Sequence, residues 1–203
     1  RASIGPSGHL LSRRTRPRTR WESRIQAVLA ARRRTALAHD PNNDTAPRYT
    51  SYPTAPHFHA GVGAAQVQRW LGLVEPAEPL SLYLHIPFCD KLCWFCACHT
   101  RHTLRYEPVA RYLDVLIEEI DLVSRLLDGR GVVEAIHFGG GSPTMLKPTD
   151  LKRLDRALRQ SFRISPTLSL AVEIDPSDMD DARLDALAEI GLTRASLGVQ
   201  DFD

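Results

Sequence analysis

Short apolar strands alternate with amphipathic helices along most of the chain, and this alternation constrains the fold more than any other feature. Strands that stop at Pro or Gly, or that follow a helix-ending Gly, are predicted at 80–86, 132–138, 168–174 and 194–199. The gaps between these strands are long enough to hold a helix. Strands joined in this way form parallel βαβ units with right-handed crossovers. The sequence therefore predicts an α/β fold with a parallel sheet.

Three helices are predicted where apolar residues recur at helical spacing. The clearest ends before Gly129 and has one apolar face, made of Val109, Tyr112, Leu113, Leu116, Ile117, Ile120, Val123 and Leu127. The second begins near Thr149 or Asp150, and the third runs from about Met179 to a terminating Gly191. Each helix lies between two predicted strands, as βαβ units require.

Four strand–helix units cannot close a parallel barrel, which needs eight units and about 250 residues. The chain has 203 residues, of which 43% are hydrophobic and 25% charged, so it can bury a core. It has no run of about 18 apolar residues, and no membrane-spanning helix is predicted. We interpret 80–203 as the first half of a TIM-type (β/α) barrel, whose functional groups are expected at the carboxyl ends of the strands.

The basic charge is concentrated at the N-terminus. Residues 1–40 hold ten arginines against Glu22 and Asp40, whereas the rest of the chain has sixteen basic and twenty-two acidic residues. We interpret 1–45 as a basic, disordered extension and 46–79 as a separate N-terminal segment. A transit peptide and contact with nucleic acid or an anionic membrane are alternatives. Trp21 is the one aromatic residue in 1–40, which argues against a specific nucleic-acid surface. We expect neither a nucleic-acid nor a membrane partner.

All four cysteines fall within ten residues, as Cys89, Cys93, Cys96 and Cys98. A disulfide-stapled fold would scatter its cysteines, so this cluster indicates ligands or redox groups in a reducing compartment. The first three have C-x3-C-x2-C spacing, and soft thiolates suit iron–sulfur clusters or zinc. Three ligands on a four-iron cluster leave one iron open to a substrate.

Zinc is the alternative for this loop. Cys93 and Cys96 form a plausible half-site, which Cys98, His99 or His102 could complete. Zinc sites usually combine two separated ligand pairs, and the sequence has no second cysteine pair. The spacing therefore favours the iron–sulfur cluster over a non-catalytic zinc-binding domain.

C-x3-C-x2-C after a first barrel strand resembles the radical S-adenosylmethionine (SAM) superfamily. The resemblance implies a partial barrel and a [4Fe–4S] cluster held by Cys89, Cys93 and Cys96. It also implies that SAM binds the fourth iron and that one electron cleaves it to methionine and a 5′-deoxyadenosyl radical. Cys98 is not carried over as a ligand.

Longer motifs resemble one family within this superfamily, the oxygen-independent coproporphyrinogen III oxidases. They are PRYTSYPTA at 47–55, YLHIPFC at 83–89, CWFCAC at 93–98, FGGGSPT at 138–144, EIDP at 173–176 and GVQDF at 198–202. The resemblance implies a cytoplasmic radical SAM oxidoreductase of heme biosynthesis. Such an enzyme decarboxylates two propionates of coproporphyrinogen III to vinyl groups, giving protoporphyrinogen IX. It also implies two bound SAM molecules and an unidentified electron donor, and we expect a monomer.

The resemblance assigns the cofactor contacts of four side chains. The Tyr83 phenol hydrogen-bonds at the cluster-bound SAM, and Phe95 packs on its adenine or ribose or shields the cluster. Glu173 binds the first SAM, where a carboxylate accepts from ribose hydroxyls or meets an ammonium. Gln200 contacts the second SAM.

The resemblance also assigns the glycine-rich turn after the second strand. Glycine lets the backbone approach a ligand closely. Gly140 is expected at the first SAM, and Gly141 with Ser142 at the second. The family commonly has Thr at the position of Ser142, so the hydroxyl is retained. His85, on the same strand face as Tyr83, is expected to be structural.

Relatives that act as heme chaperones are the nearest alternative within the superfamily. They share the HIP-x-C opening but bind heme without decarboxylating it. They generally lack the extra cysteine and the PRYTSYPT segment, both of which this chain has. A heme-degrading methyltransferase relative is a more distant alternative. We also expect this 203-residue chain to be inactive by itself, because half a barrel leaves the site open to water.

Overall fold

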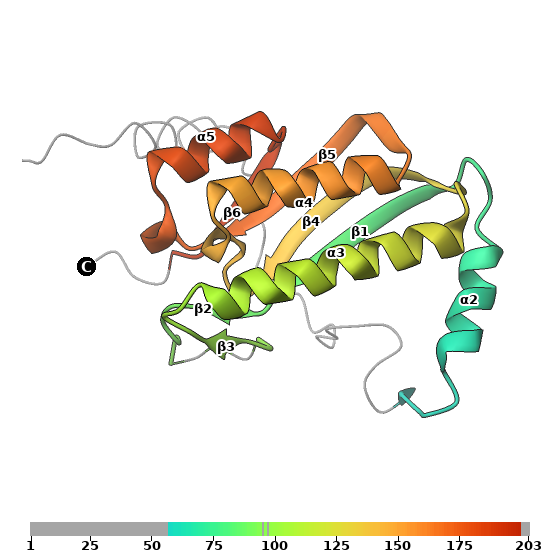
Figure 1. Ribbon diagram of the computed structural model, residues 1–203, viewed down its shortest axis with the longest axis horizontal. Coiled ribbons are helices and arrows are strands. Elements are labelled where there is room, and N and C mark those ends of the chain that lie inside the picture. The colour runs from blue at the N-terminus through green and yellow to red at the C-terminus, as the bar shows by residue number, and fades with distance from the viewer. Residues whose placement is uncertain (1–56, 95, 97, 200–203) are drawn as a thin grey trace, which may run out of the picture. The chain divides into compact units, whose positions relative to one another are not determined.

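The computed structural model describes residues 57–94, 96 and 98–199 (Figure 1). Four parallel strands form its main sheet in the order β1-β4-β5-β6, which follows the chain. They are β1 (Pro79–Ile86), β4 (Val132–Gly140), β5 (Ile164–Ile174) and β6 (Arg194–Leu197). This topology confirms the predicted α/β fold with a parallel sheet.

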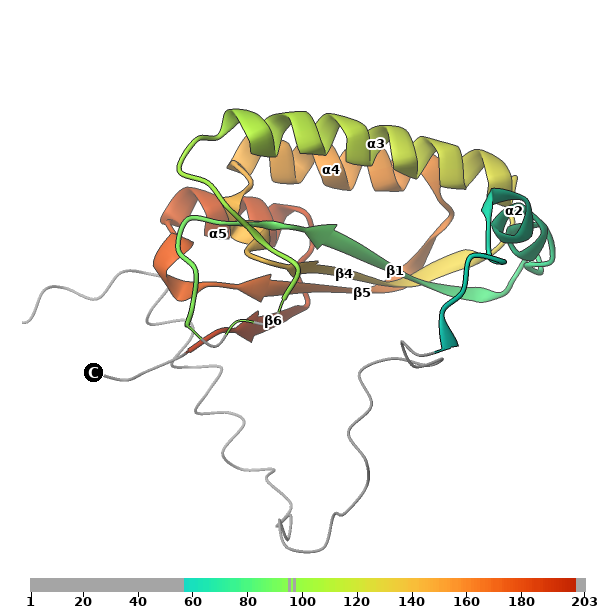
Figure 2. The same cartoon turned by 90° about the horizontal axis from the view of Figure 1, so that it is seen from below.

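The three predicted helices connect these strands and lie on one face of the sheet (Figure 2). They are α3 (Glu107–Leu127), α4 (Pro148–Ser161) and α5 (Asp181–Glu189). Right-handed crossovers place all connecting helices on the same side of a sheet whose strand order follows the chain. The opposite face corresponds to the interior of a barrel.

The core lies between the sheet and these three helices, and α5 adds Ala186 and Leu187 to it. Five residues of the predicted apolar face of α3 are buried, and α4 buries three leucines: Val109, Leu113, Leu116, Ile120, Leu127, Leu151, Leu154 and Leu158. Phe138 of β4 and Val172 of β5 are fully buried beneath them. Burying each such side chain contributes about 1.5–3 kcal/mol, so the core holds the strands in a fixed register.

Several boundaries differ from the sequence prediction. β4 continues into the glycine turn, and β5 begins at Ile164 rather than 168. The third helix begins at Asp181 rather than Met179, because Asp180 caps it by accepting from the Arg183 amide at 2.7 Å. The 3-10 turn η3 (Pro176–Asp178) occupies the space before it. β6 ends at Leu197 instead of Val199.

Some elements were not predicted. They are α2 (Ala64–Gly72), the two-residue strands β2 (Phe88–Cys89) and β3 (Arg101–His102), and the 3-10 turn η2 (Pro143–Met145). Both β1 and β6 are edge strands of the described sheet. The prediction for 1–45 lies outside the described residues, and the proposed boundaries at 45 and 79 stay predictions. None of the described helices is long and apolar enough to cross a membrane.

Tyr106 joins the start of α3 to the start of α4. Its hydroxyl donates to the Asp150 carboxylate and accepts from the Lys147 amide at 3.1 Å. The Lys147 ammonium lies 4.2 Å from the centre of its ring. We expect Tyr106→Phe to lower the free energy of unfolding by about 1 kcal/mol, the usual net worth of such hydrogen bonds. Urea titration measures this change.

The same residue predicts a pH dependence of stability. Burial, and then the hydrogen bond to Asp150, raise the pKa of Tyr106 to about 12 from its ordinary 10.0. The unfolded chain therefore loses this proton first, and the stabilisation present below pH 10 is lost as the pH rises toward 12. We expect the unfolding free energy of the wild type to fall more steeply over this window than that of Tyr106→Phe. If the unfolding free energies of the two proteins fell in parallel between pH 10 and 12, this prediction would be contradicted.

Candidate functional site

The carboxyl ends of β1, β4 and β5 meet at one edge of the sheet and carry most of the predicted site residues. In the register, His85 and Ile86 of β1 pair with Gly139 and Gly140 of β4. Cys89 follows directly in β2, and Glu173 is the penultimate residue of β5. This is the edge at which parallel α/β folds bind their ligands.

The glycine turn packs directly against the start of the cysteine loop. The Gly141 amide donates to the Ile86 carbonyl at 2.9 Å, and the Ser142 amide donates to the Phe88 carbonyl at 2.7 Å. A Cβ atom on Gly141 would lie 2.6 Å from the Phe88 oxygen and 2.9 Å from the Cys89 sulfur. Gly140 has a φ of +120°, which L side chains rarely adopt. Both positions therefore require glycine.

Glu173 is held in place by two neighbours and stays accessible. One carboxylate oxygen accepts from the Gly140 amide at 3.1 Å, and the other lies 3.1 Å from Nε2 of His137. The side chain is 42% exposed. Its remaining lone pairs can therefore accept from a ligand above the sheet edge. His137 lies two residues before the turn and was not predicted as part of the site.

Tyr83 and His85 form a second hydrogen-bonded pair beside Glu173. The Tyr83 hydroxyl lies 3.1 Å from Nδ1 of His85, and Nε2 of His85 lies 2.9 Å from the His99 carbonyl. Burial, followed by the charges of Glu173 and Cys98, raises the pKa of Tyr83. Tyr83 therefore stays a neutral phenol. His85 links β1 to the end of the cysteine loop, and its structural role stays a prediction.

The cysteine loop is closed by backbone pairing at its two ends. The Arg101 amide donates to the Pro87 carbonyl at 2.7 Å, and the Thr103 amide donates to the Cys89 carbonyl at 3.0 Å. Nε2 of His102 lies 2.8 Å from the Asp90 carbonyl. Protein contacts therefore fix the base of the loop.

The three predicted ligand thiols differ in their surroundings. Cys89 is half-buried against the glycine turn, whereas Cys93 and Cys96 are exposed, and all three are free thiols. Burial raises the pKa of Cys89 to about 11, and the charges of Cys96, Asp178 and Cys93 add to the effect. A bound cation reverses such repulsion between thiolates.

The residues present fit an iron–sulfur cluster in the type and number of their donors. Three soft thiolates stand on one closed loop, next to a turn that only glycine can form. No three metal-ligating side chains converge on one point among the described residues. The loop thus carries the three predicted ligand thiols but does not gather them by protein contacts alone.

The remaining predicted site residues are Ser142, Phe95 and Gln200. The Ser142 side chain is buried, 2% exposed, and donates to a carboxylate oxygen of Asp178 at 2.6 Å. Phe95 and Gln200 lie outside the described residues. Asp178 was not predicted, because no motif marks an acid on the turn that follows β5.

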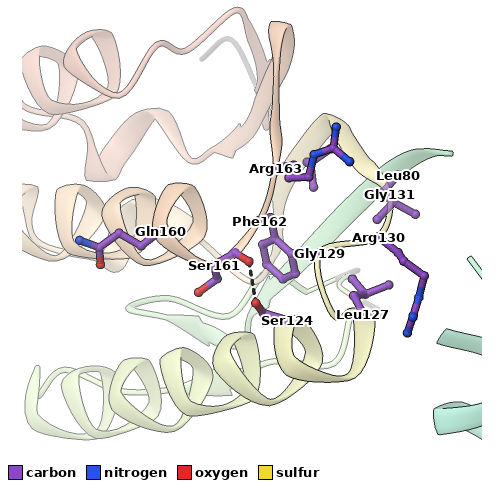
Figure 3. Close-up of a pocket in the computed structure, with 11 residues that line it drawn as sticks. Leu80, Ser124, Leu127, Gly129, Arg130, Gly131, Gln160, Ser161, Phe162 and Arg163 are labelled. Carbon is purple, nitrogen blue, oxygen red and sulfur yellow. Dashed lines mark hydrogen bonds between the residues drawn. The ribbon is translucent and has the colours of Figure 1, made fainter. Parts of the chain in front are cut away.

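A cavity of about 200 Å³ lies at the opposite end of the strands (Figure 3). Leu80, Val133 and Arg163, near the starts of three strands, line it. The Ser124 hydroxyl donates to the Ser161 carbonyl at 2.6 Å and ties the ends of two helices together there. In parallel barrels this end of the strands serves stability, so the cavity is separate from the candidate site.

Comparisons with known proteins agree with this geometry. Residues 83–203 match the family model of the Radical SAM superfamily. The chain is 45% identical over 157 residues to the oxygen-independent coproporphyrinogen III oxidase of Paracoccus denitrificans, covering 77% of this chain and 35% of that protein. It is 46% identical over 160 residues to the oxidase of the same name from Pseudomonas aeruginosa, with the same coverage.

A solved structure is similar as well. The coproporphyrinogen III oxidase of Escherichia coli, described as a radical SAM enzyme, superposes with a TM-score of 0.72 at 41% identity. The match covers 76% of this chain and 35% of that one. The chain thus spans about a third of the length of the relatives it matches.

Proposed function

Because this chain belongs to the radical SAM superfamily, we propose that it forms the cluster- and SAM-binding part of an oxygen-independent coproporphyrinogen III oxidase. The reaction proposed is the oxidative decarboxylation of coproporphyrinogen III to protoporphyrinogen IX in heme biosynthesis. The observation that carries the proposal is the position of the loop with its three thiols, beside a glycine-only turn, Glu173 and Tyr83 at one sheet edge. The similarity to oxidases of this name supports the choice of substrate.

Membership in the superfamily implies a [4Fe–4S] cluster and SAM. In our proposal Cys89, Cys93 and Cys96 hold the cluster. When bound, the cluster supplies the electron that cleaves SAM and so starts hydrogen abstraction from the substrate propionates. Cys89 anchors the loop to the sheet, because the glycine turn packs against its sulfur. The two exposed thiols are free to move toward a common centre.

Two groups beside the loop are suited to hold SAM. The Glu173 carboxylate, fixed by His137 and the Gly140 amide, accepts from an amino group or from ribose hydroxyls. The neutral Tyr83 phenol, 59% exposed, offers a hydrogen bond without adding charge. Proteins use such hydrogen-bonded groups around a metal centre to orient what the metal binds.

The finer assignments are also part of the proposal. They are a second SAM molecule at Gly141 and Ser142, a first at Gly140, and contacts from Phe95 and Gln200. We place the protein in the cytoplasm, because cluster assembly requires reduced thiols. A monomer and an external electron donor stay predictions.

A chimera tests the proposal. The matching 157 residues of the Paracoccus denitrificans oxidase would be replaced by those of this chain. The product would be reconstituted anaerobically with iron and sulfide, then supplied with SAM, a reductant and coproporphyrinogen III. We expect protoporphyrinogen IX together with 5′-deoxyadenosine. The same chimera carrying Cys89→Ser is the matched control and should form neither.

Two outcomes would contradict the proposal in different ways. A chimera that holds the cluster and cleaves SAM but leaves coproporphyrinogen III unchanged would place the chain with the heme-binding relatives. One zinc per chain and no sulfide, measured on the 203-residue chain itself, would exclude the radical chemistry altogether. The 203-residue chain by itself, without the rest of the Paracoccus denitrificans oxidase, is expected to give no protoporphyrinogen IX.

A further inference from the structure

The glycine turn, extended here to Thr144, is held from one side by the segment that runs from the end of β5 into α5. Three hydrogen bonds reach it at intervals of five residues along that segment. Glu173 accepts from the Gly140 amide at 3.1 Å, Asp178 from the Ser142 hydroxyl at 2.6 Å, and Arg183 donates through Nε to the Thr144 carbonyl at 2.8 Å. On the other side, the Gly141 and Ser142 amides donate to Ile86 and Phe88. The turn therefore bridges two neighbouring segments.

The middle bond has a buried donor, and that donor has a second partner. Ser142 is 2% exposed and Thr144 is fully buried, and their hydroxyls lie 2.8 Å apart. A serine hydroxyl has one hydrogen, which goes to Asp178, so Thr144 donates to Ser142. Because the Ser142 hydroxyl is committed to protein partners, its contribution to a ligand site is to place the backbone of the turn.

Asp178 keeps this position against nearby charge of the same sign. Burial raises its pKa, and the acids Asp90 and Asp175 add to this, whereas the hydrogen bond from Ser142 and the charge of Arg183 lower it. Arg183 also pairs with Asp180 and reaches the Thr144 carbonyl. Asp90, Asp175 and Asp178 thus lie close together at the sheet edge, and the hydrogen bond from Ser142 holds Asp178 in place among them.

We propose that Asp178 is a positioning residue, which fixes the Gly140–Ser142 backbone for SAM through the Ser142 hydroxyl. Its link to SAM rests on the proposed function of this edge. The hydrogen bond from Ser142 to Asp178 joins the turns that follow β4 and β5. The glycine turn lies at the end of β4, and Glu173 lies at the end of β5. Losing that hydrogen bond would remove the middle one of the three bonds on this side, while those from Glu173 and Arg183 and the bonds to Ile86 and Phe88 remain.

Amide hydrogen exchange of the 203-residue chain tests the positioning role without any cofactor. In Asp178→Ala, we expect the Gly141 and Ser142 amides to exchange roughly tenfold faster, equivalent to about 1.4 kcal/mol. Asp178→Asn keeps a carbonyl oxygen that accepts from Ser142, so it should restore most of the protection. If Asp178→Ala fails to fold, Asp178→Asn is compared with the wild type instead. Exchange at Gly141 and Ser142 that is faster than in the wild type, but less than roughly tenfold faster, would then support the proposal.

Ser165→Ala is the matched control. Ser165 is buried, 8% exposed, and its hydroxyl lies 3.0 Å from Thr167, two residues on, as Ser142 lies near Thr144. It stands near the start of β5, at the other end of the strand. This variant should leave exchange at Gly141 and Ser142 unchanged. Equal acceleration in Ser165→Ala, or none in Asp178→Ala, would overturn the proposal.

SAM affinity, measured by equilibrium dialysis on the chain loaded with iron and sulfide, tests the consequence for the ligand. We expect Asp178→Ala to weaken SAM binding roughly tenfold, and Ser165→Ala to leave it unchanged. If the Gly141 and Ser142 amides exchanged faster in Asp178→Ala but SAM affinity stayed the same, the inference would be contradicted. A wild-type chain that assembles the cluster but binds no SAM would instead contradict the proposed function, and amide exchange would still decide the role of Asp178.

Discussion

Replacing Cys89 by serine is expected to abolish assembly of the iron–sulfur cluster. The proposed cluster has three protein ligands, so the loss of one cannot be made up by another. A serine oxygen is a poor donor to iron in such sites. Cys89 is also the half-buried ligand, set in β2 against the glycine turn. We expect iron to fall from about four per chain to less than about one after anaerobic reconstitution. Iron and acid-labile sulfide analysis measures it.

Cys98→Ser is the control for this experiment. Cys98 lies in the same loop and is exposed, but it stands outside the C-x3-C-x2-C spacing. Its replacement should leave the iron and sulfide content near that of the wild type. If Cys98→Ser lost the cluster and Cys89→Ser kept it, the assignment of the ligands would be wrong. Both variants can be prepared in parallel, so differences in reconstitution do not affect the comparison.

The sheet and its helices were predictable because their signals are local. The apolar face of α3 repeats at helical spacing over five turns, and Gly129 stands two residues after its last member, Leu127. The helix does end at Leu127, with Asp128 and Gly129 in left-handed conformations. Gly191, with a φ of +89°, likewise follows α5 as expected. The strand order follows from the tendency of consecutive strands to lie side by side, and the face that the helices cover follows from right-handed crossovers.

The contacts that hold the site together were not predictable, because they join residues far apart in the sequence. His137 of β4 meets Glu173 of β5, 36 residues further along the chain. Ser142 and Asp178, in the turns after these strands, are also 36 residues apart. Spacing along one strand gives no sign of such a pair. The short pairing of β2 with β3 was missed for a related reason. Two-residue strands have no periodicity, and tertiary contacts decide whether they form.

Gly141→Ala is expected to destabilise the fold by about 2 kcal/mol and to disturb cluster binding. Overpacking a closely packed site by one methyl group typically costs about 1–3 kcal/mol. Here the new Cβ would lie 2.6 Å from the Phe88 carbonyl oxygen, which is backbone and cannot swing aside. It would also lie 2.9 Å from the Cys89 sulfur, so relief of the clash must move a proposed ligand. Urea titration and iron analysis measure the two effects.

Gly72→Ala separates the clash from the general effect of replacing glycine. Gly72 ends α2, and a Cβ there would meet no atom within 4 Å. Alanine favours helix over glycine by about 1 kcal/mol, so this variant should be as stable as the wild type or slightly more so, with unchanged iron content. If Gly141→Ala behaved like Gly72→Ala, the turn could yield without moving Cys89. The close packing of the glycine turn against the cysteine loop would then not be what positions the first ligand.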